Sequence, residues 1–161
     1  RRLRQLGHED ICLVCTGAQE DYRCQGYVDG LLAELREWDP GRHVRLLGLL
    51  PRTEQIQLMR CAAAIVQPSL FEGWSALLED CRCLGKRVYA TDLRVHREQD
   101  VAATFFPAGD ADALTDMLAA EWPLLAPGPD LEAEAAARRV MAERVPAFAR
   151  RFLTIMRQAA P

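Results

Sequence analysis

Short apolar runs alternate with amphipathic stretches along most of the chain. Residues 11–17 (ICLVCTG) form a continuous apolar run that ends at a glycine, which is typical of a strand buried on both faces of a sheet. Four further runs of this kind are HVRLLG at 43–48, AAIVQPS at 63–69, KRVYATD at 86–92 and ATFFPAG at 103–109. The pattern therefore predicts five strands.

The stretches between these runs carry apolar residues at helical spacing. In residues 22–38, for example, Leu31 and Leu35 share one stripe, which predicts an amphipathic helix. Asp110 is placed to cap another helix, and Pro146 predicts a break or a kink in a long final helix. Alternating strands and helices with short connections predict an α/β fold: a doubly wound, Rossmann-like parallel sheet with helices on both faces.

The length of the chain bounds its organisation. Its 161 residues suit one domain with a real core, which we predict over residues 1–161. The chain opens on a helix that stops at Gly7, whereas a doubly wound domain is expected to begin with a strand. We therefore expect the first strand and its loop to lie upstream, in a larger protein.

Composition excludes several classes of function. The net charge is −3 with both signs interspersed, so no footprint for nucleic acid is present. No run reaches the roughly 18 apolar residues of a membrane span, and the start lacks a signal-peptide core. The six cysteines lack zinc-site spacing, and we expect buried free thiols, no metal site and a cytoplasmic location.

The loop PSLFEGWS at 68–75 carries the most informative chemistry. In open parallel sheets, ligands bind beyond the carboxyl ends of the strands, where this loop is expected. Gly73 permits a tight turn, and Ser75 can cap a helix that closes at Gly85. The amide groups of Ala76 and Leu77 then face outward at a helix start, which attracts phosphate.

Two acids flank this helix start. Glu72 lies just before it, and Asp80 lies one turn beyond Ala76 on the same face. Carboxylates in these places suit a sugar diphosphate, because each can accept hydrogen bonds from a vicinal diol. Taken singly, each acid could equally be solvated. Glu79 is rotated by about 100° on the helix and is a rival to Asp80.

Residues 66–98 (VQPSLFEGWSALLEDCRCLGKRVYATDLRVHRE) resemble the donor-binding region of retaining GT-B glycosyltransferases of family 4 (group 1). That family carries E-x7-E across a strand, loop and helix. Here Glu72 matches the first acid and Asp80, with a shorter side chain, takes the place of the second. The flanking segments 44–69, 103–118 and 150–158 also fit the family's order of elements. The resemblance implies the C-terminal half of a GT-B fold.

The resemblance implies a role for each matching residue. Glu72 would be catalytic, holding the hydroxyls of the transferred sugar, and Asp80 would hold the ribose. Gly73 and Trp74 would shape the pocket, although Trp74 could equally be a core aromatic. The other substrate-binding positions are the backbone amides near Ser75, Ala76 and Leu77 at the distal phosphate and the loop of Gly48, Leu49 and Leu50 beside the base.

The implied activity is sugar transfer from a nucleotide diphosphate donor to an acceptor hydroxyl, with retention and without a cofactor or an essential metal. The family's basic pair lies upstream of this sequence, so the segment alone is expected to be inactive. The acceptor, a glycan or a lipid-linked sugar in polysaccharide biosynthesis, would be bound by the missing N-terminal domain. Base, sugar, acceptor, oligomeric state and any contact of the full protein with the inner face of a membrane stay open.

Other interpretations stay open as well. The chain could be a non-catalytic module that binds nucleotide sugars or partners, or, more remotely, a nucleotide-sugar epimerase. The segment from His96 to Glu98 follows a strand end, where loop packing or a surface role is favoured over lining the cleft. If Pro146 bends the last helix, Phe148, Phe152 and Ile155 are expected to form an apolar surface that returns toward the missing half.

Overall fold

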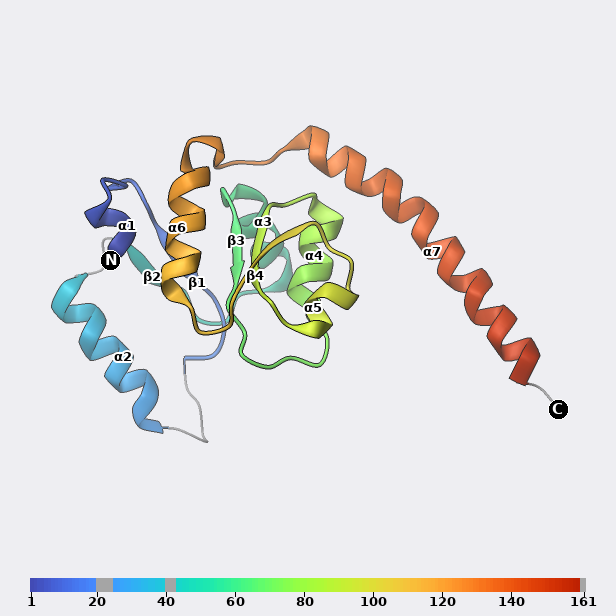
Figure 1. The fold of residues 1–161 in the computed structure, drawn as a ribbon, viewed down its shortest axis with the longest axis horizontal. Coiled ribbons are helices and arrows are strands. Elements are labelled where there is room, and N and C mark those ends of the chain that lie inside the picture. The colour runs from blue at the N-terminus through green and yellow to red at the C-terminus, as the bar shows by residue number, and fades with distance from the viewer. Residues whose placement is uncertain (20–24, 40–42, 160–161) are drawn as a thin grey trace. The chain divides into compact units, whose positions relative to one another are not determined.

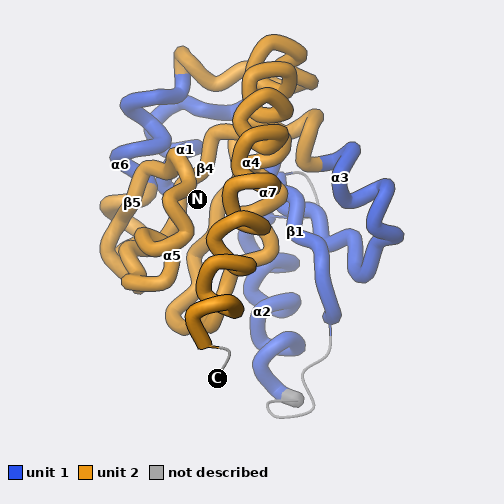
Figure 2. The backbone as a smooth tube through the Cα atoms, turned by 90° about the vertical axis from the view of Figure 1, so that its right-hand side faces the viewer, with its two compact units in different colours: residues 1–58, 115–122 blue, residues 59–114, 123–161 orange. Residues whose placement is uncertain are grey.

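The computed structural model describes residues 1–19, 25–39 and 43–159, which divide into two compact units (Figure 2). Unit 1 comprises residues 1–58 and 115–122, and unit 2 comprises residues 59–114 and 123–161. The elements in chain order (Figure 1) are α1 (Arg2–Gln5), β1 (Leu13–Cys15), α2 (Gln25–Trp38), β2 (Val44–Leu46), α3 (Arg52–Cys61), β3 (Ile65–Gln67), α4 (Ala76–Leu84), β4 (Val88–Thr91), α5 (Arg94–Glu98), β5 (Ala103–Phe106), α6 (Ala111–Glu121), a 3-10 turn (Trp122–Leu124) and α7 (Leu131–Ala159).

Unit 1 is built around two parallel strands. β1 pairs with β2, with Leu13 opposite Val44. Asp39 sets the entry into β2, because its carboxylate accepts hydrogen bonds from the amides of His43 (3.0 Å) and Val44 (2.7 Å). Although burial raises the pKa of Asp39, these two amides and the nearby charges of His43 and Arg4 lower it below its usual value.

Unit 2 holds a three-stranded parallel sheet in the order β3-β4-β5, so β4 has a partner strand on each edge. All four residues of β4 are buried, and Tyr89 and Ala90 are completely inaccessible to solvent. The apolar run at 86–92 therefore forms the both-faces-buried strand that the pattern predicts. Parallel pairing in both units confirms the α/β fold class with Rossmann-like, parallel sheets.

Helix α4 begins and ends where the sequence predicts. Ser75 is its N-cap, and the Ser75 hydroxyl oxygen accepts a hydrogen bond from the amide of Leu78. Gly85 ends the helix in the left-handed conformation with φ of 62°. A Cβ atom at Gly85 would lie 2.6 Å from the carbonyl oxygen of Ala133 in α7. Glycine is needed here both for its backbone angle and for the close approach of α7.

The first turns of α7 are fixed within unit 2, and its second half is not covered. Glu134 accepts two hydrogen bonds from the Arg60 guanidinium, at 2.7 and 3.0 Å. From residue 142 to residue 159 every side chain of α7 is exposed, and this stretch includes Phe148, Phe152 and Ile155; whether they face another part of a larger protein stays a prediction. Figure 1 shows the helix running on as one rod.

Two expectations from the sequence are wrong, and a third is narrowed. The break predicted as one outcome of Pro146 does not occur, since α7 continues through this residue; the alternative, a kink, stays a prediction. β1 is not buried on both faces: Leu13 is 47% exposed in a sheet of only two strands. Of the cysteines the structure describes, Cys81 alone is buried, and Cys12, Cys15, Cys61 and Cys83 are exposed or half-buried. Their burial therefore gives no support to a reducing compartment.

No helix in the described part of the chain is both long enough and apolar enough to span a membrane.

Candidate functional site

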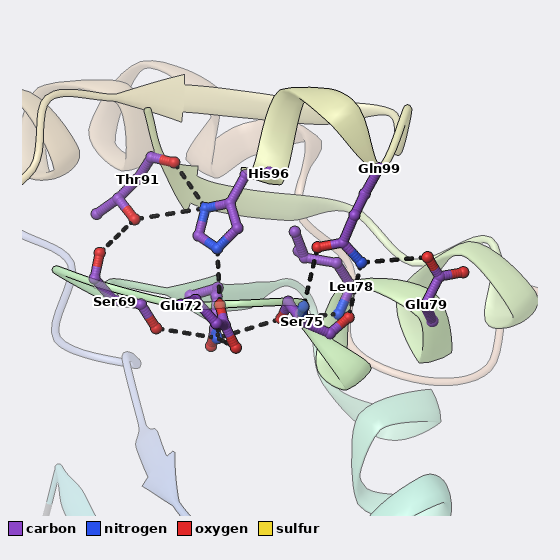
Figure 3. A network of polar contacts seen from close by, with 9 residues as sticks. Ser69, Glu72, Ser75, Leu78, Glu79, Thr91, His96 and Gln99 are labelled. Carbon is purple, nitrogen blue, oxygen red and sulfur yellow. Dashed lines mark hydrogen bonds and ion pairs between the residues drawn. The ribbon is translucent and has the colours of Figure 1, made fainter. Parts of the chain in front are cut away.

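The Glu72 carboxylate lies at the centre of a polar network at the end of β3 (Figure 3). Gln67, the last residue of that strand, donates from Nε2 to Glu72 Oε2 at 3.1 Å, and the same nitrogen lies 3.3 Å from Oε1. The Gln67 nitrogen also lies within hydrogen-bond distance of the Ser69 and Ser75 hydroxyl oxygens. The loop is thus closed on itself around the acid, whose side chain is 22% exposed.

His96, the third residue of α5, reaches the same carboxylate from 24 residues further along the chain. Its Nε2 atom is 2.8 Å from Glu72 Oε2, and its Nδ1 atom is 2.8 Å from the carbonyl oxygen of Thr91. The ring is completely buried. Thr91 is fixed in turn, because its hydroxyl donates to the carbonyl of Ser69 at 2.6 Å. These contacts connect β4, α5 and the loop that carries Glu72 (Figure 3).

The network sets the charge state of Glu72. Partial burial by itself raises the pKa of this carboxyl. Hydrogen bonds from His96, Gln67 and Ser75, together with the charge of His96, outweigh that effect and lower the pKa below its usual value. Glu72 is therefore held as a carboxylate at neutral pH, and this carboxylate is ordered before any ligand arrives.

The backbone at the start of α4 is fixed by one buried amide side chain. Gln99 Oε1 accepts from the Ser75 amide at 3.0 Å, and Gln99 Nε2 donates to the Ser75 carbonyl at 2.9 Å. The Ser75 amide is thus already occupied. The amides of Ala76 and Leu77 have no acceptor among the described residues. These are the first two amides of a helix, which have no partner within it.

The two rival acids on α4 differ in their surroundings. Glu79 accepts from Gln99 Nε2 at 3.1 Å and pairs with Arg82. Its carboxylate therefore belongs to the framework that holds α4 and α5 together. Asp80, the next residue on α4, is half-buried and is not part of the Glu72 network shown in Figure 3.

The loop beside Glu72 presents apolar side chains to solvent. Phe71 is 90% exposed and Trp74 is 58% exposed. Trp74 is therefore not a core aromatic, which excludes the alternative reading of this residue. Gly73, between Glu72 and Trp74, is exposed, and a Cβ atom added there would meet no atom within 4 Å apart from its chain neighbours. Exposed aromatic side chains next to a carboxylate can stack on a flat or ring-shaped ligand.

The predicted base-binding loop lies in unit 1. Gly48 has a positive φ of 70°, and its carbonyl oxygen accepts from the Gly17 amide at 2.9 Å, so the loops after β1 and β2 are joined. Leu49 is 79% exposed, and Leu50 is half-buried. Glu72 lies in unit 2. Whether both loops contact one ligand stays a prediction.

The structure adds His96, Gln67 and Gln99 to the candidate site, and the sequence analysis singles out neither glutamine. Of the two roles favoured for the segment around His96, the surface role is excluded for His96 itself, whose ring packs in the interior against Glu72. The available signal was the spacing of His96 and Gln99, three apart and so on one face of a short helix. In the described part of the chain, no group of three or more His, Cys, Asp or Glu side chains is arranged to hold a metal ion.

Comparisons with known proteins support the fold and give no family. No family model matches the chain. No curated protein matches it either. Among solved structures, the chain is similar to Anabaena Alr3699/HepE, solved in complex with UDP, with a TM-score of 0.66 and 16% sequence identity. The match covers 90% of this chain and 44% of the other, so this chain spans less than half the length of that protein.

Proposed function

We propose that the chain is the donor-binding domain of a GT-B glycosyltransferase, which binds a nucleotide diphosphate sugar and acts in sugar transfer. The observation that carries the proposal is the carboxylate of Glu72, held beside a helix start with two unoccupied amides. The fold likeness to a protein solved with UDP supports it. An anion-binding helix start and an adjacent acceptor of hydroxyl hydrogen bonds match the two ends of such a donor.

The distal phosphate would bind at the amides of Ala76 and Leu77. The partial positive charge at this helix start would stabilise the negative charge that develops on the leaving diphosphate. The occupied Ser75 amide narrows the predicted contact from three amides to two. Glu72 would accept hydrogen bonds from the hydroxyls of the transferred sugar and orient it for attack by an acceptor hydroxyl.

Asp80 is the acid that we propose for the ribose hydroxyls. Glu79, the rival acid, contacts Gln99 and Arg82; the choice of Asp80 rests on its place eight residues after Glu72. The exposed Gly73 and Trp74 would line the sugar end of the pocket, and Gly48, Leu49 and Leu50 would flank the base. These assignments rest on the resemblance to family 4 described above.

The finer properties of the enzyme are proposals from the same resemblance. They are membership of family 4, retention of anomeric configuration and transfer without a cofactor or an essential metal. An acceptor glycan or lipid-linked sugar would be bound by an upstream domain, in polysaccharide biosynthesis in the cytoplasm. The segment alone would be inactive if, as the resemblance implies, the basic pair that neutralises the diphosphate is supplied from outside it.

Calorimetric titration of the intact protein with UDP, GDP, ADP and their sugars tests the proposal. We expect one of these ligands to bind, and we expect Asp80→Ala to weaken that binding by about tenfold, which is the loss of one charged hydrogen bond. Glu72→Ala should lower the turnover of the nucleotide sugar more than the binding of the diphosphate. Glu132→Ala, an exposed acid on α7, is the control and should change neither.

The outcomes separate the enzyme from its alternative. Binding without turnover in the presence of cell-derived glycan acceptors would favour a non-catalytic nucleotide-sugar-binding module. No binding of any of these ligands would refute the donor-site proposal. The anomeric configuration of the product, read by NMR, decides between retention and inversion.

A further inference from the structure

The ring of His96 lies between two hydrogen-bond acceptors. Nδ1 faces the Thr91 carbonyl oxygen, which has no hydrogen to donate, so Nδ1 carries a hydrogen. Nε2 faces the Glu72 carboxylate at 2.8 Å, and an ionised carboxylate likewise only accepts. With Glu72 ionised, both ring nitrogens must donate. The geometry therefore describes an imidazolium bound to a carboxylate, rather than a neutral histidine.

No other charged side chain competes for this pair among the described residues. The two arginines of α5 pair with acids other than Glu72: Arg94 with Glu98, and Arg97 with Asp92. Glu79 is bonded to Arg82 and to the neutral Gln99. The ion pair of Glu72 and His96 is completely buried on the histidine side, where a low effective dielectric strengthens the attraction.

The ion pair of Glu72 and His96 reduces the repulsion between the Glu72 carboxylate and a bound phosphate. A free carboxylate beside the amides of Ala76 and Leu77 would repel the phosphate that those amides attract. An imidazolium bonded to Glu72 cancels that charge and still leaves Oε1, whose contact with Gln67 is long at 3.3 Å, for a ligand hydroxyl. The contact with Thr91 anchors the ring in β4, the most deeply buried strand of unit 2.

We propose that His96 is the positioning residue of the donor site: as an imidazolium fixed on Thr91, it orients the Glu72 carboxylate toward the sugar and neutralises it beside the diphosphate. This inference rests on the proposed function and deepens it. His96 does not touch the ligand, since its side chain is completely buried, and it acts through Glu72.

Two substitutions separate orientation from charge. In His96→Gln, the amide nitrogen can take the place of Nε2 and still donate to Glu72, without a positive charge. In His96→Asn, the amide nitrogen takes the place of Nδ1 and donates only to Thr91. For the intact protein with its best nucleotide sugar, we expect kcat/KM to fall by about tenfold or more in His96→Asn and by less in His96→Gln.

The pH profile carries the signature that a packing role would not give. If the charge on the ring matters, His96→Gln should not restore wild-type turnover, and its pH profile should differ from that of the wild type. Full rescue by His96→Gln at every pH would overturn the role of the charge. Unchanged kinetics in both variants, with folding verified by circular dichroism, would overturn the inference altogether.

A measurement without any ligand tests the pair directly. In the ¹⁵N NMR spectrum of wild-type intact protein at neutral pH, both nitrogens of His96 should be protonated, and in Glu72→Gln one of them should not. A singly protonated wild-type ring would overturn the inference even if the protein transfers sugar. If no nucleotide binds, the proposed function fails and the positioning role fails with it, while the NMR result still reports on the pair itself.

Discussion

The two units contain the same kind of parallel strand pairing but differ in how deeply they bury it. Every residue of β4 in unit 2 is buried, whereas Leu13 of β1 and Leu47 after β2 in unit 1 are 47% and 45% exposed. Of the buried apolar residues, Leu3 is in unit 1 and the rest, from Met59 to Phe106, are in unit 2. The strand that is buried along its whole length, β4, is also the one with a partner strand on each edge.

The candidate site follows the same division. Glu72, His96 and Gln99 all lie in unit 2. His96 is hydrogen-bonded to Thr91 of the buried β4, and Gln99, the C-cap of α5, is hydrogen-bonded to Ser75, the N-cap of α4. The loops of Gly17 and Gly48 in unit 1 are joined by one backbone hydrogen bond. Each unit fixes a carboxylate, but they are held differently: Asp39 in unit 1 accepts from backbone amides at the start of β2, whereas Glu72 in unit 2 is held by side chains from separate segments.

Removing a core side chain should give the largest difference between the units. Leu78 is completely buried in α4, and Leu78→Ala should lower the free energy of unfolding by about 2–5 kcal/mol through the lost contacts and the cavity. Leu13→Ala in unit 1 should cost less than about 1 kcal/mol, because that side chain is half in water. Urea denaturation measures both, and equal losses would contradict the comparison.

Adding a side chain where α4 and α7 approach closely should give the next largest loss of stability. Gly85→Ala forces a left-handed backbone on alanine and places its Cβ atom 2.6 Å from the Ala133 carbonyl oxygen, so we expect a loss of about 1–3 kcal/mol. Gly109→Ala is the matched control, with a φ of 79° and open space around the site. It carries the backbone strain alone and should shift the melting temperature less.

Removing the N-cap of α4 should lower stability by a smaller amount and should also weaken nucleotide binding. Ser75→Ala removes the acceptor of the Leu78 amide and should cost about 1 kcal/mol. Asp130 caps α7 in the same way, accepting from the Ala133 amide at 2.9 Å, so Asp130→Ala should cost a similar amount. Only the first variant should also weaken nucleotide binding, as measured by titration calorimetry. Equal nucleotide binding by the two variants would show that the α4 cap is not needed for the donor site.

Lowering the pH should destabilise each unit, because one hydrogen-bonded carboxylate in each becomes protonated. We expect this loss of stability to be the smallest of the four effects. Arg60 hydrogen bonds lower the pKa of Glu134 in unit 2, and its ion pair therefore stabilises the fold above the ordinary carboxyl pKa of about 4. That stability is lost as the pH falls through the lowered value. Glu134→Gln should make the stability of unit 2 less dependent on pH. The pH dependence that Asp39 gives to unit 1 should not change. Hydrogen exchange measures both. An unchanged acid profile in unit 2 would contradict the assignment.

Much of the fold was predictable because its signals are local. The apolar runs locate all five strands, and Ser75 and Gly85 mark both ends of α4 through rules that involve only a few neighbouring residues. The acid at position 72 and the helix start beside it were likewise readable. The exposure of β1 and the continuity of α7 through Pro146 were not, because they depend on what packs against each element.

The sequence by itself determined where the strands, the caps and the acidic loop lie, since hydrophobic period and capping chemistry act within a few residues. Only the tertiary structure decided which side chains meet at the carboxylate. His96 lies 24 residues from Glu72, and Gln99 lies 24 residues from Ser75. Parallel pairing of β3 with β4 brings these distant segments together, and no local pattern specifies that a histidine there will turn inward to an acid.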